Sequence, residues 1–345
     1  MSDDTERAYQ ILVSEVMLQQ TQVERVRVIF VDFLKQFPRL RDLARASNRE
    51  VILAWRGMGY NSRALRLRDA ARHIAGKFLV SGCWLLVGEH KTKNQKPVTK
   101  NHHPTTKNHF PKSMEELQSI PGIGHYTAAA ILNFAFNIPT PCIDTNIRRI
   151  LHRTFIGPEN PDGTWKKDDR YLLRLAGEVL QLACHDELVE PWARVSTLRR
   201  AQGDTLPYIP HDARNWHAAL MDFGSLVQTK SKPKWEECPL TARGLMVTTK
   251  SSFEGSNQKP VTKNQKLRES GRIIRGRFTP NRIIRGRIVE ALRDARQGLP
   301  LDIIGRTVCT DWSKKRHQEW LSEIVEKLKR DKLITCKRKK YILAD

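Results

Sequence analysis

Apolar residues recur at helical spacing through the first 78 residues. Two apolar faces consist of Ile11, Leu12, Val16 and Leu18, and of Val26, Ile29, Phe30, Phe33 and Leu34. Apolar positions three and four residues apart are typical of amphipathic helices, and the alternation of half-buried strands is nearly absent. The pattern predicts successive helices over residues 8–78.

The last 60 or so residues have a different pattern. Residues 287–296 have a helical pattern, and Trp320, Leu321, Ile324, Val325 and Leu328 form the apolar face of a longer amphipathic helix. Two short strands are predicted on either side of residues 337–340. This order favours a small winged-helix-like domain at residues 282–345, and the alternative is a basic helical tail without a fixed role.

Polar segments interrupt the helical pattern. The segment 91–112 contains Lys, Asn, His, Thr and Pro and no acidic residue, a composition that cannot form a core. We therefore interpret residues 79–110 as an inserted basic loop and residues 196–210 as a second, irregular insertion. Both fall within a first domain at residues 1–240.

Two phrases occur twice in the chain. Asn-Gln-Lys-Pro-Val-Thr-Lys-Asn stands at 94–101 and 257–264, and Arg-Ile-Ile-Arg-Gly-Arg at 272–277 and 282–287. They are copies rather than units of a solenoid. Residues 241–281, which contain the second copy of the first phrase, are predicted to be a linker.

The chain is strongly basic. Its 345 residues include 60 Lys and Arg against 37 Asp and Glu, a formal net charge of +23. Self-repulsion on this scale calls for a polyanionic partner, and nucleic acid fits better than a membrane surface because phosphate neutralisation supplies affinity without sequence specificity. The longest apolar stretch, 79–88, is far shorter than the roughly 20 residues of a membrane span. Without a secretory signal at its start, the chain is expected to act in the cytoplasm, on nucleoid-associated DNA.

The six cysteines are scattered along the chain without the two-residue spacing of metal-binding pairs. Such spacing suits reduced thiols better than a disulfide framework or a zinc site. We expect neither disulfides nor a bound metal.

A glycine-containing turn precedes the apolar helix predicted at 128–136. The segment Ile120-Pro-Gly-Ile-Gly-His-Tyr-Thr127 places Gly122 and Gly124 where the backbone must turn tightly, and the helix that follows offers unpaired N–H groups to an oxyanion. Such a hairpin can bind a DNA phosphate without reading a base. Alone, the motif is also a common turn.

Two carboxylates stand out by their neighbours. Asp144 lies ahead of a new helix in the segment 141–149, where an aspartate is most often only an N-cap. Glu15 lies three residues after Leu12 and three before Leu18, so it shares a largely apolar helix face, although a surface position is the alternative. Apolar neighbours raise the pKa of a carboxyl group and keep its proton near neutrality.

With these motifs, the chain resembles the adenine-specific mismatch DNA glycosylases of the MutY family, which belongs to the helix-hairpin-helix superfamily. The resemblance covers residues 8–78 and 111–240. It rests on Ser14–Val23, Trp55–Tyr60, the hairpin, Ile143–Asn146 and Trp216–Gly224. It implies a mainly α, two-lobed helix-hairpin-helix glycosylase fold, here with the small winged-helix-like module at its carboxy terminus, acting as a monomer on double-stranded DNA that contains a mismatch.

The resemblance implies a monofunctional DNA glycosylase that hydrolyses the N-glycosidic bond of adenine mispaired with guanine or 8-oxoguanine, a step of base excision repair. Glu15 would protonate the adenine, and Asp144 would stabilise the cationic sugar and position water. Tyr126 and Asn146 would support them. Tyr126 replaces the lysine with which bifunctional relatives form a Schiff base, so lyase activity is expected to be weak or absent.

The resemblance also implies the DNA-binding residues. Base excision requires the adenine to leave the stack and the gap to be filled. The filling wedge would comprise Gln20, Thr21, Met58 and Tyr60, next to Gln19; ordinary core packing is the alternative for Met58 and Tyr60. Gly122, Gly124 and His125 would bind phosphate.

The chain departs from the family at the positions of an iron–sulfur cluster. Members commonly hold it by four cysteines, and the corresponding positions here are Gln228, Trp235, Cys238 and Gly244. A single thiolate cannot hold such a cluster. We therefore expect no cluster, with Trp235 filling its place.

The family also usually has a helix before the point where this sequence begins, and a carboxy-terminal domain that reads 8-oxoguanine, whose place the winged-helix-like module takes. Two other functions remain open: a thymine or uracil mismatch glycosylase of the same superfamily, and a DNA-binding protein without catalysis. Gln19 and Gln20 argue against the first, and the presence of both carboxylates against the second.

Overall fold

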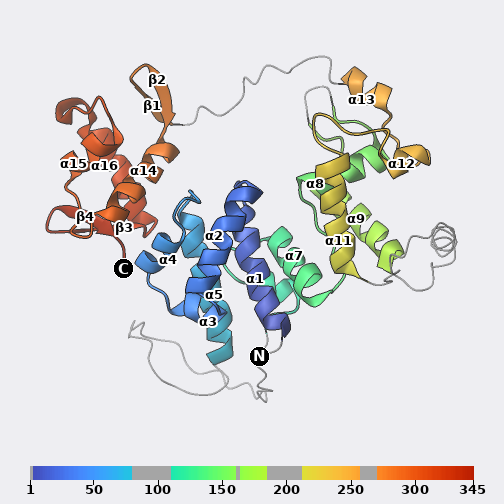
Figure 1. The fold of residues 1–345 in the computed structure, drawn as a ribbon, viewed down its shortest axis with the longest axis horizontal. Coiled ribbons are helices and arrows are strands. Elements are labelled where there is room, and N and C mark those ends of the chain that lie inside the picture. The colour runs from blue at the N-terminus through green and yellow to red at the C-terminus, as the bar shows by residue number, and fades with distance from the viewer. Residues whose placement is uncertain (1–2, 80–109, 161–163, 185–211, 257–269) are drawn as a thin grey trace, which may run out of the picture. The chain divides into compact units, whose positions relative to one another are not determined.

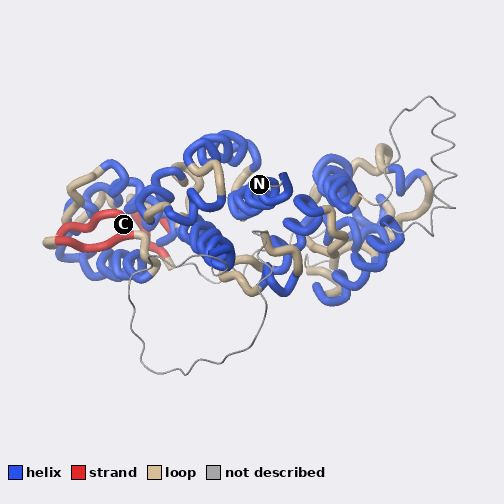
Figure 2. The backbone as a smooth tube through the Cα atoms, turned by 90° about the horizontal axis from the view of Figure 1, so that it is seen from below, coloured by secondary structure: helices blue, strands red, loops and turns tan. Residues whose placement is uncertain are grey.

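The computed structural model describes residues 3–79, 110–160, 164–184, 212–256 and 270–345 (Figure 1). Helices dominate this part of the chain, and the strands that Figure 2 shows belong to short hairpins, which confirms the predicted mainly α class. Contacts divide the chain into two units. Unit 1 comprises Met1–Pro111, Ser119–Ile123 and Arg268–Asp345, and unit 2 comprises Lys112–Gln118 and Gly124–Leu267.

Several predicted segments lie outside the described residues. They are the 79–110 insertion apart from its two end residues, the 196–210 insertion, and both copies of the phrase at 94–101 and 257–264. In the part of the chain that is described, no helix is both long and apolar enough to cross a bilayer.

Unit 1 begins with the predicted run of helices. These are α1 (Asp3–Leu18), α2 (Val23–Gln36), α3 (Leu40–Arg45), α4 (Asn48–Ala54) and α5 (Ser62–Leu79). Phe33 of α2 is fully buried, and its ring meets Phe37 and Trp55 edge to face at centroid distances of 5.0 and 5.8 Å. A capping box of Ser47 and Glu50 starts α4.

The carboxy-terminal module has the order of a winged helix. Its elements are α14 (Asn281–Asp294), α15 (Leu301–Val308), α16 (Lys314–Arg330), β3 (Ile334–Lys337) and β4 (Lys340–Leu343). β3 and β4 pair antiparallel, and Leu299, between α14 and α15, adds a bridge to Tyr341 of β4. Helix, short strand, two helices and a hairpin follow one another, as the predicted winged-helix-like module requires. The helix α15 was missing from the prediction.

A second hairpin precedes this module within the predicted linker. Strands β1 (Gly271–Ile274) and β2 (Arg277–Pro280) pair antiparallel around a two-residue turn of Arg275 and Gly276, both with positive φ. Positive φ at both turn positions is the signature of a type I′ turn, which suits the twist of a two-stranded ribbon.

The module and the amino-terminal helices share one hydrophobic core in unit 1. Ile52 of α4 and Leu65 of α5 belong to the buried cluster of the module, together with Ile284, Ile288, Leu292, Ile304, Val308, Leu321, Ile324, Val325 and Leu328. Polar contacts reinforce this packing. Arg293 Nη2 of α14 donates to Asn61 Oδ1 at 2.9 Å.

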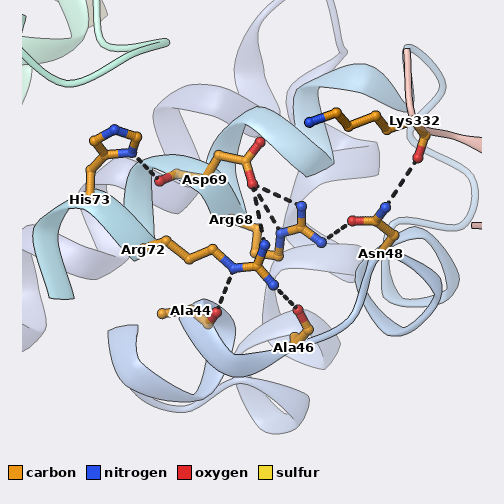
Figure 3. A network of polar contacts seen from close by, with 8 residues as sticks. All are labelled: Ala44, Ala46, Asn48, Arg68, Asp69, Arg72, His73 and Lys332. Carbon is orange, nitrogen blue, oxygen red and sulfur yellow. Dashed lines mark hydrogen bonds and ion pairs between the residues drawn. The ribbon is translucent and has the colours of Figure 1, made fainter. Parts of the chain in front are cut away.

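Figure 3 shows a polar network around α5 in the same unit. Arg68 contacts the side-chain oxygen of Asn48, and Asn48 Nδ2 donates to the carbonyl of Lys332 at 3.2 Å. Arg72, one turn further along α5, donates to the carbonyls of Ala44 and Ala46 at 2.8 and 3.0 Å. Unit 1 therefore joins the two ends of the sequence into one folded body.

Unit 2 contains the other helices of the described residues: α6 (Met114–Gln118), α7 (His125–Phe136), α8 (Thr145–Leu151), α9 (Asp169–Cys184), α11 (Ala213–Asp222), α12 (Pro239–Ala242) and α13 (Lys250–Ser256). The π-helical turns η1 (His152–Ile156) and η3 (Phe223–Val227) extend α8 and α11. Its central cluster contains Ala129, Cys142, Ile147, Leu151 and Leu172.

Candidate functional site

Two loops of unit 1 carry the residues predicted to fill the gap in DNA. Loop A (residues 19–22) follows α1, and loop B (residues 55–61) joins α4 to α5. Gln20 and Tyr60 have φ values of +57° and +46°, and Gly57 and Gly59 in loop B are also left-handed. Such a conformation is costly for residues other than glycine, and it concentrates at functional sites.

A buried arginine holds the two loops together. Arg63, at the start of α5, is 4% exposed. Its Nη1 donates to the carbonyls of Val16 at 3.0 Å and Met17 at 3.1 Å, and it also contacts that of Gln19. Its Nη2 donates to Thr21 Oγ1 at 3.0 Å. One guanidinium therefore satisfies the carboxy-terminal carbonyls of α1 and orders loop A.

The same nitrogen of Arg63 also reaches loop B. Nη2 lies 3.2 Å from the carbonyl of Met58 and 3.4 Å from that of Gly59. The guanidinium carbon is 5.5 Å from the ring centroids of both Trp55 and Tyr60, within cation–π range. Burial lowers the pKa of Arg63, and the ring of acceptors explains how a charged group is accommodated there.

Sequence reasoning missed Arg63, although a signal was present. Arg63 stands four residues before Leu67 and seven before Ala70, both buried positions of α5. A charged residue on an apolar helix face needs partners, because an unpaired buried charge is costly.

The predicted wedge residues differ in exposure. Met58 is buried, so the alternative of core packing describes its side chain, whereas the Tyr60 side chain is 45% exposed. Gln19 and Gln20 are exposed and Thr21 is half-buried. The structure brings loop A and loop B together, as a shared wedge requires.

Glu15 lies on α1, one turn before loop A. It is half-buried, and its neighbours Leu12 and Val16 are buried. Glu15 therefore lies on a largely apolar face of α1, as predicted. That it holds a proton near neutrality stays a prediction.

The second carboxylate caps a helix in unit 2. Asp144 Oδ1 accepts from the backbone N–H of Ile147 at 2.6 Å, so Asp144 has the N-cap role that its position suggested. This bond uses one of the two carboxylate oxygens. Asp144 belongs to unit 2 and Glu15 to unit 1, and their pairing across a catalytic site stays a prediction.

A second buried arginine organises the surroundings of Asp144. Arg149 Nη2 donates to Asn146 Oδ1 at 2.7 Å and to the carbonyl of Gly224 at 2.6 Å, and its Nε donates to the carbonyl of Gln228 at 2.6 Å. Burial lowers the pKa of Arg149, and the negative charge of Asp144 opposes that shift. Sequence reasoning missed Arg149 as well.

Gly224 shows how closely α8 and η3 approach one another. A Cβ atom at this position would lie 2.6 Å from Cβ of Asn146, which no real side chain tolerates. Glycine at the end of the 216–224 motif therefore permits the position of Asn146 within unit 2.

The hairpin residues join α6 to α7. Gly122 has a φ of +93°, and Gly124 is the extended N-cap residue of α7. The left-handed conformation requires glycine at 122. His125 begins α7, and Tyr126 packs against the central cluster of unit 2.

The four positions that correspond to cluster ligands lie in unit 2. Gln228 and Cys238 are fully buried, Trp235 is 6% exposed, and Gly244 has a φ of +63°. The sulfur of Met246 lies 3.6 Å from Gln228 Nε2 and 3.5 Å from Cys238 Sγ. This donor set, with one thiol and a methionine sulfur among its side chains, does not fit an iron–sulfur cluster.

An arginine and two aromatic rings fill the adjoining space. The rings of Trp235 and Phe253 lie 5.6 Å apart, and the guanidinium carbon of Arg153 is 4.6 Å from the centroid of Phe253. Arg153 Nη1 also donates to Gln228 Oε1 at 3.2 Å. Packing and a buried cation thus connect the residues at these positions.

The family of the chain follows from its sequence. Residues 13–169 match the family described as HhH-GPD superfamily base excision DNA repair protein. The chain belongs to this helix-hairpin-helix superfamily. Within it, the chain is similar to curated adenine DNA glycosylases.

Three relatives illustrate this similarity. The adenine DNA glycosylase of Mus musculus is 30% identical over 253 residues, 72% of this chain and 44% of that protein. That of Homo sapiens is 31% identical over 234 residues, 68% of this chain and 32% of that protein. That of Mycobacterium tuberculosis H37Rv is 29% identical over 234 residues, 67% of this chain and 57% of that protein. The chain thus spans between about a third and somewhat over half the length of these relatives.

Two solved structures also match. A thermostable thymine-DNA glycosylase is 20% identical with a TM-score of 0.47, over 70% of this chain and 84% of that one. A non-covalent endonuclease III–DNA complex is 15% identical with a TM-score of 0.45, over 71% of this chain and 86% of that one.

Proposed function

We propose that the protein is a monofunctional DNA glycosylase that hydrolyses the N-glycosidic bond of adenine mispaired with guanine or 8-oxoguanine. The observation that carries the proposal is the similarity to curated adenine DNA glycosylases over about two thirds of the chain. Both carboxylates lie within residues 13–169, which match the base excision DNA repair family. The net charge of +23 supports duplex DNA as the partner.

The chemistry divides between the two carboxylates. Adenine is a poor leaving group as an anion, so Glu15 donates a proton to the base. Positive charge that develops on the deoxyribose is stabilised by the carboxylate of Asp144, as paired carboxylates do in glycosidases. A half-buried position beside Leu12 and Val16 suits an acid, and a helix N-terminus suits an ionised group.

Tyr126 supports hydrolysis without strand cleavage. A Schiff base with the sugar needs an amine nucleophile, and a phenol cannot form one. We therefore assign the enzyme base release alone, with abasic DNA as its product.

We further propose that unit 2 is held by packing in place of an iron–sulfur cluster. Trp235, Phe253, Met246 and the buried guanidinium of Arg153 supply contacts at positions where a cluster would need thiolates. No step of the proposed reaction passes through such a cluster.

A panel of duplexes tests the proposed function. The protein is incubated with adenine opposite guanine, adenine opposite 8-oxoguanine, and thymine opposite guanine, and alkali then reveals abasic sites. Cleavage of the adenine strand in the first two duplexes is the expected result. Cleavage of the third alone would show a thymine glycosylase, and cleavage of none would favour a DNA-binding protein without catalysis.

A further inference from the structure

Unit 1 contains a pocket between the wedge loops and the winged-helix-like module. Its volume is about 640 Å³. Loop A and loop B form one side, including Gln20, Thr21 and Tyr60, and α14 forms the other. The pocket is therefore continuous with the residues assigned to the gap in DNA.

The charge of this pocket is one-sided. Arg25, Arg282 and Arg285 line it, and no acidic residue is among its described lining residues. Arg282 Nη1 donates to Tyr60 Oη at 3.1 Å, so α14 touches an exposed wedge residue directly. Arg285 pairs with Asp331 at the end of α16, outside the lining, which orients its guanidinium at the pocket edge.

The other walls of the pocket are apolar. Val289 of α14 and Leu328 and Leu333 of the module contribute buried side chains. Apolar walls with a few polar groups are typical of small-molecule sites, and pockets of roughly 300–1,000 Å³ hold ligands larger than one base. Guanidinium groups bind phosphate oxygens, while bases are held by stacking and by contacts to their edges.

Eversion of the adenine produces a ligand that suits these walls, namely a nucleotide with a phosphate and an unpaired base. When adenine leaves the stack, the nucleotide opposite it loses its pairing partner and lies beside the wedge. We propose that this pocket receives that unpaired nucleotide, with its phosphate at Arg282 and Arg285 and its base between the two loops and the apolar wall. This inference rests on the proposed function, and it makes α14 part of the mismatch-recognition surface.

The proposal differs from the common docking mode of related modules. Helix-turn-helix folds place their second helix in the DNA groove. Here α16 corresponds to that helix by chain order, and it carries exposed Lys315 and Arg316. The pocket instead points to α14 as the helix that meets the distorted nucleotide.

Binding by the full chain separates the two helices. The variants are Arg282→Ala with Arg285→Ala, and Lys315→Ala with Arg316→Ala, which remove the same charge from the same module. Kd is measured by fluorescence anisotropy with duplexes that carry a non-hydrolysable adenine nucleoside opposite guanine, opposite an abasic analogue, or paired with thymine. Wild type is expected to bind the guanine and abasic duplexes, in which the nucleotide opposite adenine has no pairing partner, more tightly than the paired duplex.

The first double variant is expected to lose that preference, with Kd raised about tenfold for the guanine and abasic duplexes, which both retain the phosphate, and little change for the paired duplex. The second is expected to weaken all duplexes equally. Arg282→Gln alone, at an exposed position, provides the same test if the double variant unfolds. The proposal would be overturned if Arg282→Gln and the first double variant kept the wild-type ratio of Kd between the paired and guanine duplexes. It would also be overturned if the second double variant lost that ratio instead. Adenine release by wild type, measured separately, tells whether the proposed function itself fails.

Discussion

The buried guanidinium of Arg63 donates a hydrogen bond to the hydroxyl of Thr21 at 3.0 Å. This bond ties the first turn of α5 to loop A, more than 40 residues earlier in the sequence. The same guanidinium contacts six oxygen acceptors of α1, loop A and loop B, so it fixes the shape of both loops at once.

Replacing Arg63 therefore tests how the wedge is held. Arg63→Lys keeps the charge but cannot span the same acceptors, because an ammonium group lacks the planar fork of a guanidinium. We expect a loss of about 3 kcal/mol in the free energy of unfolding, since several buried carbonyls lose their donor. Urea denaturation measures it. Arg66→Lys, at an exposed position of the same helix, is the control and should stay within about 0.5 kcal/mol of wild type.

Gly224 offers a test of the packing behind Asn146. Gly224→Ala places a methyl group 2.6 Å from Asn146 Cβ, so α8 and η3 must separate. We expect destabilisation by about 1–3 kcal/mol and slower adenine release at saturating enzyme. Gly76→Ala in α5 has open space around the added methyl group and should stabilise by up to about 1 kcal/mol. Equal stability of the two variants would contradict the close approach.

His217 predicts a pH dependence of stability. It is buried, its Nδ1 lies 2.8 Å from the carbonyl of Ala213, and burial lowers its pKa below the ordinary value of 6.5. A lowered folded-state pKa means that the unfolded chain binds the proton more readily. The contribution of neutral His217 to the free energy of unfolding is therefore full above pH 6.5. It is lost as the pH falls from 6.5 toward the pKa of His217 in the folded state.

The measurement compares the free energy of unfolding at pH 7.5 and 5.5. Wild type should lose more stability over this interval than His217→Gln, which has no proton to bind. His73→Gln, at an exposed position of α5, should behave like wild type. An identical loss in His217→Gln would show that other groups set the dependence.

The aromatic packing near Cys238 gives another test. Purified protein is expected to lack stoichiometric iron and sulfide, because the side chains present cannot supply four thiolates. Trp235→Ala should lower the free energy of unfolding by about 3–5 kcal/mol, as truncation of a buried aromatic side chain does. Leu245→Ala, at an exposed position, should have little effect. Stoichiometric iron and sulfide in the wild-type protein would refute this part of the account.

The repeated hexapeptide shows why part of the fold could not be predicted. Arg-Ile-Ile-Arg-Gly-Arg forms a strand and a turn at 272–277 and the first turns of a helix at 282–287. In both copies the second isoleucine is buried, Ile274 and Ile284, while the first is exposed. The local sequence is the same, so the surrounding contacts decide which structure forms.

The amino-terminal helices of unit 1 and helices α14 and α16 of the winged-helix-like module could be predicted because each buries one apolar stripe. The shared core of Ile52, Leu65 and the module could not, since no local pattern tells which apolar stripes will meet across more than 200 intervening residues. Arg63 and Arg149 escaped for a related reason. Their partners are mostly backbone carbonyls, which every sequence possesses and no residue pattern marks.

Asp144 requires a variant that separates its two roles. Asn is as good an N-cap as Asp, so Asp144→Asn keeps α8 capped while it removes the charge. Its free energy of unfolding should stay near that of wild type. Asp144→Ala loses the cap as well and should be less stable by about 1 kcal/mol.

The proposed function assigns the release of adenine to two carboxylates, Glu15 and Asp144. Single-turnover release of adenine from a duplex with adenine opposite guanine tests it most directly, with wild type, Glu15→Gln and Asp144→Asn compared at saturating enzyme. We expect each variant to fall by about 10²- to 10⁴-fold while its affinity for the duplex persists. Near wild-type rates in both variants would contradict the assignment.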